Sequence, residues 1–363
     1  VTGITVGNGG TSGANQNTAD ITMDSALTIA GPISVYGGAL TVNNSHISTL
    51  LGAKLLFKAV NGISVNMTMR TNKGPAVFWS NAAGTSTAST ISFGNGTFVD
   101  TTNNLGASST DGGRITIAGG TTTDANGDPT GFTTNSGTTS SDAGVILGPA
   151  MGSSAAKFYS GGGAIKIFGS SSTTKGVIIS NGTLINSALG SITIEGRATA
   201  SATTYTPNGV EFNWGSINGG QCTMQSSLAT GTAIKITGTS ASGIGINSNS
   251  SGTSSVKGTI QVTDAGSVEL NATGASGLSD ATLKWTNVLT KNGDITYNGG
   301  SVGLTLTNSV FGSATGTSVT TDTGNVTFVT DKYSGNATNS IANSGYAAIL
   351  SLIHISEPTR LLS

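Results

Sequence analysis

The apolar residues of this chain alternate with polar ones in one short pattern that returns many times. Two branched apolar residues stand two positions apart and Gly often follows, as in residues 115–119 (ITIAG) and 165–169 (IKIFG). Residues two apart in an extended chain point to the same side, so each copy has one apolar face and one polar face. A strand this short cannot bury its apolar face alone, whereas stacked copies can. The pattern therefore predicts an all-β solenoid built of stacked rungs.

The copies are unevenly spaced along the chain. Further copies occupy residues 192–196, 234–238, 259–264, 294–297 and 325–328. A constant strand pattern with uneven spacing indicates variable surface loops on a regular core, and it argues against a propeller, whose blades are more uniform in length. A rung of about 25 residues would allow about 14 rungs in a rod of about 65 Å.

We expect one solenoid array over residues 1–349, with the clearest repeats in 161–330. Residues 119–143 carry the weakest strand pattern and are rich in Thr, Ser, Asn, Gly and Asp, which predicts a long loop that projects from the solenoid.

Composition supports an ordered, uncharged β-protein. Gly accounts for 55 of 363 residues, and only 9% of residues are charged, with a net charge of −1. Disorder is the alternative for a chain rich in Gly, Ser and Thr, but 36% of the residues are hydrophobic and they follow period two. So little positive charge argues against a nucleic-acid partner. The chain has no run of about 20 apolar residues, so no transmembrane helix is predicted.

The last residues differ in character from the rest. Residues 350–360 (LSLIHISEPTR) resemble the translation of a transposase-type sequencing adapter, and the Gly/Ser/Thr repeat chemistry stops near Ile349. We interpret residues 350–363 as a non-native tail and expect the chain to be a fragment from environmental DNA. A genuine capping helix is the alternative. Strands left exposed at the ends of such a fragment favour self-association.

The strand and turn pattern resembles the repeat regions of bacterial surface proteins of the filamentous-haemagglutinin and autotransporter-adhesin type. The resemblance rests on residues 25–35, 112–120, 160–167 and 291–296. It implies a right-handed parallel β-helix with irregular surface loops, export to the cell surface or secretion, anchoring in the outer membrane through a domain that this chain lacks, and adhesion to glycans or proteins of host or environmental surfaces.

The titratable residues form no catalytic or cofactor-binding motif. His46 stands beside Asn44 and Ser45, which predicts a solvated turn residue, and the single cysteine, Cys222, has no neighbouring His or Cys. The carboxylates are isolated along the sequence and do not repeat at rung spacing, as paired acid and base groups on neighbouring rungs would. We therefore expect no catalytic residues, no cofactor and no enzyme activity.

One weak candidate for a metal site is present. Asp124, Asn126 and Asp128 have the spacing that opens an oxygen-ligand calcium loop, but Pro129 stands where such a loop needs Gly. An ordinary Asn-Gly turn is the simpler interpretation. Trp79, Trp214 and Trp285 could stack on sugar rings or pack structurally.

These observations predict a structural and adhesive rod, a rigid spacer in a large bacterial surface protein. The alternative is a fragment of a carbohydrate-active β-helix enzyme, of the lyase or hydrolase kind, that lacks its catalytic rungs. A solenoid that binds ice or mineral is a third possibility, but it needs a flat array of Thr-x-Thr, and Thr305-Leu306-Thr307 alone is too little.

Overall fold

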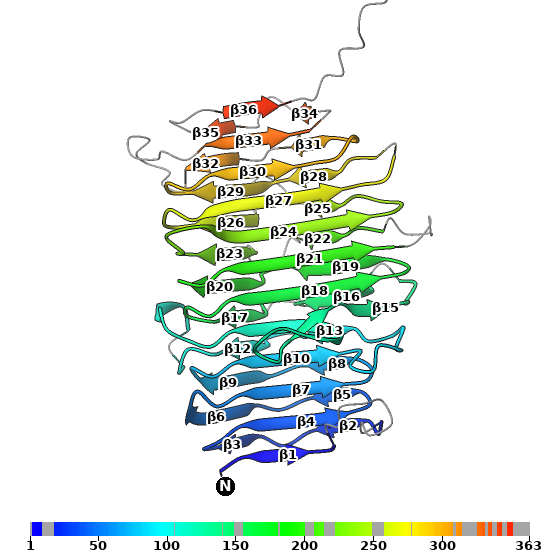
Figure 1. Cartoon of the computed structure of the whole chain (residues 1–363), viewed down its shortest axis with the longest axis vertical. Coiled ribbons are helices and arrows are strands. Elements are labelled where there is room, and N and C mark those ends of the chain that lie inside the picture. Colours follow the sequence, from blue (N-terminus) through cyan, green and yellow to red (C-terminus); the bar gives the residue numbers. More distant parts are fainter. Residues whose placement is uncertain are drawn as a thin grey trace, which may run out of the picture.

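A computed structural model shows a parallel β-helix built from three long sheets (Figure 1). It describes residues 2–8, 18–104, 106–139, 141–148, 155–180, 182–199, 207–213, 222–248, 258–276, 278–307, 310–313, 325–330, 333–335, 340–342 and 347–350. One rung contributes one strand to each sheet, and each strand pairs in parallel with the strand at the same place in the next rung. The predicted all-β parallel solenoid is confirmed.

The first sheet contains fourteen strands. They are β1 (Ile4–Val6), β4 (Ile33–Gly37), β7 (Leu55–Ala59), β10 (Ala76–Ser80), β13 (Ile115–Thr123), β18 (Ile165–Ser171), β21 (Ile192–Ala198), β24 (Thr232–Ser240), β27 (Ser267–Thr273), β30 (Ile295–Asn298), β33 (Val326–Val329) and β36 (Ala347–Leu350), with β14 (Pro129–Gly131) and β15 (Thr133–Asn135) at its side.

The second and third sheets contain eleven strands each. The second is made of β2 (Ile21–Met23), β5 (Leu40–Val42), β8 (Ile63–Val65), β11 (Ile91–Phe93), β16 (Ala143–Leu147), β19 (Lys175–Ser180), β22 (Val210–Asn213), β25 (Ile246–Ser248), β28 (Ala281–Lys284), β31 (Leu304–Thr307) and β34 (Tyr333–Gly335). The third is made of β3 (Leu27–Ile29), β6 (His46–Leu51), β9 (Thr68–Asn72), β12 (Phe98–Asp100), β17 (Lys157–Tyr159), β20 (Leu184–Ala188), β23 (Thr223–Ser226), β26 (Gly258–Val262), β29 (Thr286–Thr290), β32 (Val310–Ser313) and β35 (Ser340–Ala342).

Columns of like residues fill the interior of the helix. The two apolar positions of each first-sheet strand stack on the same positions of the next rung, so Ile165 lies on Ile192 and Ile167 on Ile194. The same columns continue through Ile234 and Ile236, and all of these side chains are fully buried. The period-two pattern therefore defines the core, because stacking in register buries each apolar face against its copies.

The Gly that closes each pattern has a structural reason. Gly169, Gly196 and Gly238 form one column where the first sheet bends towards the second. A Cβ on Gly196 or Gly238 would overlap the backbone carbonyl of the Gly just before the second-sheet strand of the same rung, Gly209 or Gly245. Two glycine columns therefore face each other and let the backbone of the two sheets come close at this corner.

Rung length varies more than the sequence pattern indicated. Twelve first-sheet strands follow one another among the described residues, not about 14, because many rungs are longer than expected. The chain between paired first-sheet residues is short from Leu55 to Ala76 and longest from Ile115 to Ile165. At the spacing of neighbouring strands, the stack is about 50 Å long.

One repeat was assigned to the wrong sheet. The sequence pattern predicts residues 259–264 as the next copy after residues 234–238, but Ile260 belongs to the third sheet and pairs with Met224. The true neighbour of Ile234 is Val268. Val268 and Leu270 carry the same alternation without the Ile-x-Ile signature, so composition misled the assignment.

The segment predicted as a projecting loop contains strands. Residues 119–131 form a hairpin in which β14 pairs antiparallel with β13, and β15 then adds in parallel to β18. The turn lies back on the outer face of the first sheet, since Asp128 reaches Thr116 and Lys54. The interpretation as a loop directed away from the rod is wrong for this part. The proposed adapter tail lies outside the described residues except for Leu350, at the end of β36.

His46 is a core residue and not a solvated turn residue. It is 1% exposed and stacks in the third sheet between Leu27 and Met69, with its ring edge-on to Phe57 at 6.2 Å between centroids. Its Nδ1 lies 2.8 Å from the carbonyl oxygen of Asn44, which can only accept, so Nδ1 carries the proton. Burial lowers the pKa of His46, and the Asn44 carbonyl offsets this only in part.

This burial makes the rod sensitive to mild acid. Below about pH 6.5 the unfolded chain binds a proton at His46 before the folded chain does, so the free energy of unfolding falls as the pH drops. We expect the urea midpoint of the natural chain to fall more between pH 7 and pH 5 than that of His46→Met, which places at this position the residue found in the next rung. Equal pH dependence in both proteins would show that His46 does not titrate across this range.

Candidate binding site on the third sheet

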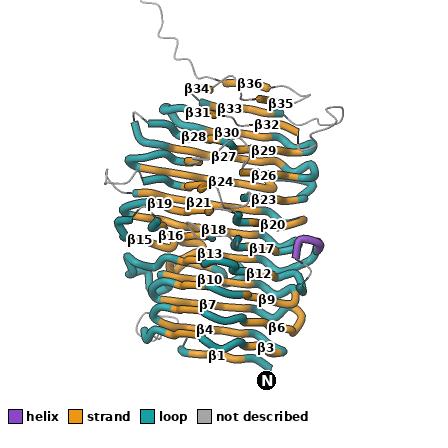
Figure 2. The backbone as a smooth tube through the Cα atoms, turned by 180° about the vertical axis from the view of Figure 1, so that it is seen from behind, coloured by secondary structure: helices purple, strands orange, loops and turns teal. Residues whose placement is uncertain are grey.

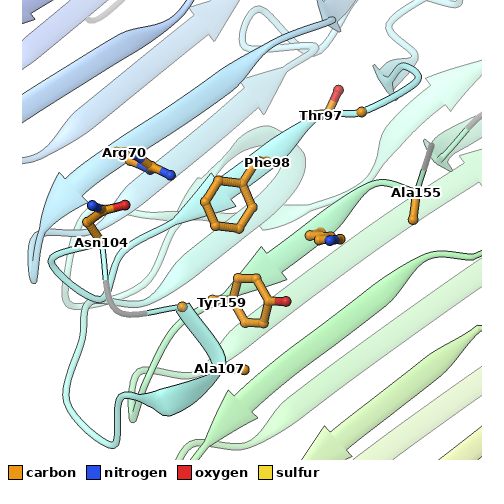
Figure 3. A pocket seen from close by; sticks show the side chains of 10 residues that line it. Arg70, Thr97, Phe98, Asn104, Ala107, Ala155 and Tyr159 are labelled. Atoms are coloured by element: carbon orange, nitrogen blue, oxygen red, sulfur yellow. The ribbon is translucent and has the colours of Figure 1, made fainter.

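A pocket of about 680 Å³ opens on the outer face of the third sheet (Figure 3). It lies over β9, β12 and β17, beside a short 3-10 helix (η2, Gly106–Ser108) that Figure 2 shows at the edge of the rod. Its lining residues are Arg70, Gly96, Thr97, Phe98, Asn104, Gly106, Ala107, Ala155, Lys157 and Tyr159.

Strand alternation places two aromatic rings in this pocket. Val99 and Phe158 point into the core and are fully buried, so Phe98 and Tyr159 on the same strands point outward. The two rings meet edge-to-face, with centroids 5.4 Å apart, and the Arg70 guanidinium carbon lies 4.9 Å from the Phe98 centroid. The pocket therefore combines aromatic faces with a cation (Figure 3).

Among the described residues, the buried Asp100 on β12 and the pocket residue Arg70 are incompletely paired. Asp100 is fully buried, and its Oδ1 accepts hydrogen bonds from the backbone and the hydroxyl of Thr102. Its Oδ2 lies 4.0 Å from Arg70 Nε, too far for a hydrogen bond, and both atoms are buried without a hydrogen-bond partner. Burial raises the pKa of the Tyr159 phenol, and the Asp100 charge adds to this, so the hydroxyl stays protonated near neutrality.

The pocket offers a specific kind of recognition. Arg70 and the exposed Lys157 give the lining two positive charges, and the one nearby negative charge is the buried Asp100, which does not line the pocket. A guanidinium binds a planar carboxylate with two parallel hydrogen bonds, while aromatic side chains combine an apolar body with a polar tip. A ligand that consists of a compact ring with one apolar face and one carboxylate would match these groups, because the face can stack on the aromatic rings and the carboxylate can bind Arg70.

The metal candidate Asp124, Asn126 and Asp128 lies elsewhere, in the hairpin turn between β13 and β14. Asp124 Oδ1 accepts backbone hydrogen bonds from Asn126 and Asp128 at 2.9 and 3.1 Å, and Gly127 has φ +72°. These contacts describe an Asn-Gly hairpin turn whose Asp caps its own backbone.

Cations of the protein already occupy these carboxylates. Asp128 is 1% exposed and binds Arg114, Lys54 and Thr116, while Asp124 Oδ2 lies 3.0 Å from Lys166 Nζ. Despite its partial burial, the hydrogen bonds from Lys166 and the turn backbone lower the pKa of Asp124 to about 2. Among the residues that the structure describes, no three His, Cys, Asp or Glu side chains gather as metal ligands. The carboxylates of the turn therefore fix the hairpin to the first sheet through ion pairs and hydrogen bonds.

Two other residues singled out from the sequence, Cys222 and Trp79, are buried. Cys222 is buried, its Sγ donates to the Ser180 carbonyl at 2.9 Å, and burial raises its pKa to about 12. Trp79 is 8% exposed, lies under Lys58 Nζ at 4.0 Å and donates from Nε1 to Gly120. Trp285 is half-buried, and Trp214 lies outside the described residues.

Sequence reasoning missed the pocket. Its residues come from three rungs separated by insertions of different lengths, so only the strand register unites them. The one available signal was Lys157-Phe158-Tyr159, where a core Phe places a Lys and a Tyr outward.

Comparison with known proteins gives no match to a family model, to a curated protein sequence or to a solved structure. Within the described parts of the chain, no helix is long and apolar enough to cross a membrane.

Proposed function

We propose that this chain is a rigid adhesive rod, part of a large secreted or cell-surface bacterial protein. The continuous parallel stack supports the rod, because the rungs from β4 to β30 bury their apolar residues against one another and are joined through three hydrogen-bonded sheets. Low charge and a surface of Ser, Thr and Asn suit a spacer that works outside the cell.

The adhesive part is the pocket on the third sheet, and its partner is an acidic glycan on a host or environmental surface. The observation that carries this proposal is the placement of Phe98 and Tyr159 beside Arg70 and Lys157 on one outward face. The C–H face of a uronic acid residue would stack on the aromatic rings while Arg70 binds its carboxylate. The length of the stack would hold this face away from the cell.

Binding to polygalacturonate tests the proposal. We expect the natural chain to bind this polymer in affinity electrophoresis more strongly than a neutral galactan, and added salt to weaken the binding. Arg70→Ala and Phe98→Ala should each weaken it by about tenfold or more, since each removes one of the two recognition elements.

Arg197→Ala is the matched control, because Arg197 also stacks on a Phe ring, Phe132, at 3.9 Å, but on the first sheet. If Arg197→Ala weakens polymer binding as much as Arg70→Ala does, the binding depends only on overall positive charge, and a defined site in the pocket is contradicted. No binding to either polymer would overturn the glycan partner. Release of reducing ends from the polymer would instead favour the carbohydrate-active enzyme.

A further inference from the structure

Three buried polar side chains meet at the second sheet, apart from the pocket, which lies over the third sheet. Lys175 begins β19, Glu211 lies in β22, and Asn208 stands two residues before β22. They are 6%, 3% and 2% exposed. Lys175 Nζ lies 3.1 Å from Glu211 Oε1, and Asn208 Nδ2 donates to Glu211 Oε2 at 2.6 Å. One carboxylate therefore holds an amine and a carboxamide together.

The rung register produces this meeting. β19 and β22 pair in parallel with Val177 opposite Val210, and the Gly176 amide donates to the Asn208 carbonyl at 3.0 Å. Lys175 and Asn208 therefore stand at the same end of two neighbouring strands. Ile178, opposite Glu211, is only 2% exposed, so an apolar neighbour keeps water from the carboxylate.

The side-chain carbonyl of Asn208 is also engaged. Its Oδ1 lies 3.3 Å from the backbone amide of Ile244, which donates to it. A donor on this oxygen draws electrons from Cγ and stabilises negative charge on the oxygen if a nucleophile adds to the carbon. Nucleophile, proton acceptor and oxyanion donor are thus the three parts that aminolysis of an amide requires.

We propose that Lys175 and Asn208 form an intramolecular isopeptide bond that covalently joins two rungs. Glu211 takes a proton from the Lys175 ammonium, and the freed Nζ lone pair forms a bond to Asn208 Cγ. The Cγ–Nδ2 bond then breaks, and its electron pair leaves with the nitrogen. The two protons lost by Lys175 pass through Glu211 to that nitrogen, which departs as ammonium. The reaction needs no oxidant, reductant or cofactor.

Each residue has a separate role in this step. Lys175 is the nucleophile, and Asn208 is the electrophile. Glu211 contacts both the attacking and the leaving nitrogen, so it acts first as base and then as acid. The amide of Ile244 stabilises the developing oxyanion. The product is a cross-link beside the glycine column, and it does not depend on the proposed adhesive function.

Mass spectrometry of the full chain tests the proposal. We expect the intact protein to be lighter than its sequence by one ammonia, about 17 Da. Trypsin should fail to cut after Lys175, and residues 167–197 should appear covalently joined to residues 198–235, which contain Asn208. Full sequence mass with free cleavage after Lys175 in the folded protein would overturn the proposal.

A matched variant excludes the other source of this mass loss. Asn208 precedes Gly209, and an Asn-Gly pair can also lose ammonia by forming a succinimide within its own backbone. Lys175→Arg keeps the positive charge beside Glu211 but removes the nucleophile, so it should abolish the loss, whereas a succinimide would persist. Glu211→Gln should also abolish it, with far-UV circular dichroism showing that each variant folds. A loss of mass that peptide mapping places at Asn208 and that persists in folded Lys175→Arg would refute the cross-link, whereas a loss at another Asn-Gly pair of the chain would not.

Discussion

Replacing Gly196 by alanine is expected to lower the free energy of unfolding by about 3 kcal/mol. The new Cβ would overlap the carbonyl oxygen of Gly209, which is backbone and cannot turn aside as a side chain would. Relief requires the corner between the first and second sheets to open. That movement would disturb the register with Gly169 on one side and Gly238 on the other. Urea unfolding followed by far-UV circular dichroism measures the loss.

Thr193→Ala is the control for this prediction. Thr193 lies on the same strand, half-buried on its outer face, and its replacement should change stability by about 0.5 kcal/mol or less. Gly196→Ala with natural stability would show that the corner has room for a Cβ and that the paired glycine columns are not a steric requirement.

Replacing Phe78 by alanine is expected to lower the free energy of unfolding by about 4 kcal/mol. Phe78 is fully buried, lies parallel to Phe57 with centroids 5.6 Å apart and meets Phe93 edge-on at 5.0 Å. Its removal leaves a cavity between the ring of Phe57 in the preceding rung and the ring of Phe93 in the same rung, and it takes away aromatic contacts from both. The shift of the urea midpoint at unchanged slope reports this loss.

Phe98→Ala separates the core from the pocket. Phe98 is an aromatic residue of the outer face, so its removal should leave most of the stability while weakening polygalacturonate binding. Phe78→Ala should do the opposite wherever the variant remains folded. Equal destabilisation by both substitutions would contradict the division of the aromatic residues into an inner column and an outer site.

The fold was readable from the sequence because each rung repeats one local rule. Ile165, Ile192 and Ile234 needed only period two to be placed in one column, and the closing Gly marked the corner. Val268 was missed because its strand, with Glu269 and Leu270, keeps the alternation but not the composition of the other copies. The burial of His46 was missed because the neighbouring Asn44 and Ser45 indicate a turn, whereas the strand begins at His46 itself.

Neither the pocket nor the buried Lys–Glu–Asn cluster could be found by spacing along the chain. Lys175 and Asn208 become neighbours only because β19 pairs with β22, and the inserted residues between them hide that register. Arg70 and Tyr159 lie on two strands that flank β12, each opposite Asp100, and long insertions along the chain hide this arrangement as well. A motif whose members come from different rungs has no fixed sequence separation, so local patterns cannot reveal it.

The direction of the ladder hydrogen bonds determines how this rod responds to mechanical force. The strands run across the rod and their hydrogen bonds along it, so tension between the two ends loads the bonds lengthwise and peels one rung at a time. Each detached rung releases a length of slack chain set by its insertions, short from Leu55 to Ala76 and longest from Ile115 to Ile165. Pulling a single molecule should therefore give a sawtooth of unequal steps. If Lys175 and Asn208 are covalently joined, the chain between them cannot extend under force, and the steps would be shorter by that length.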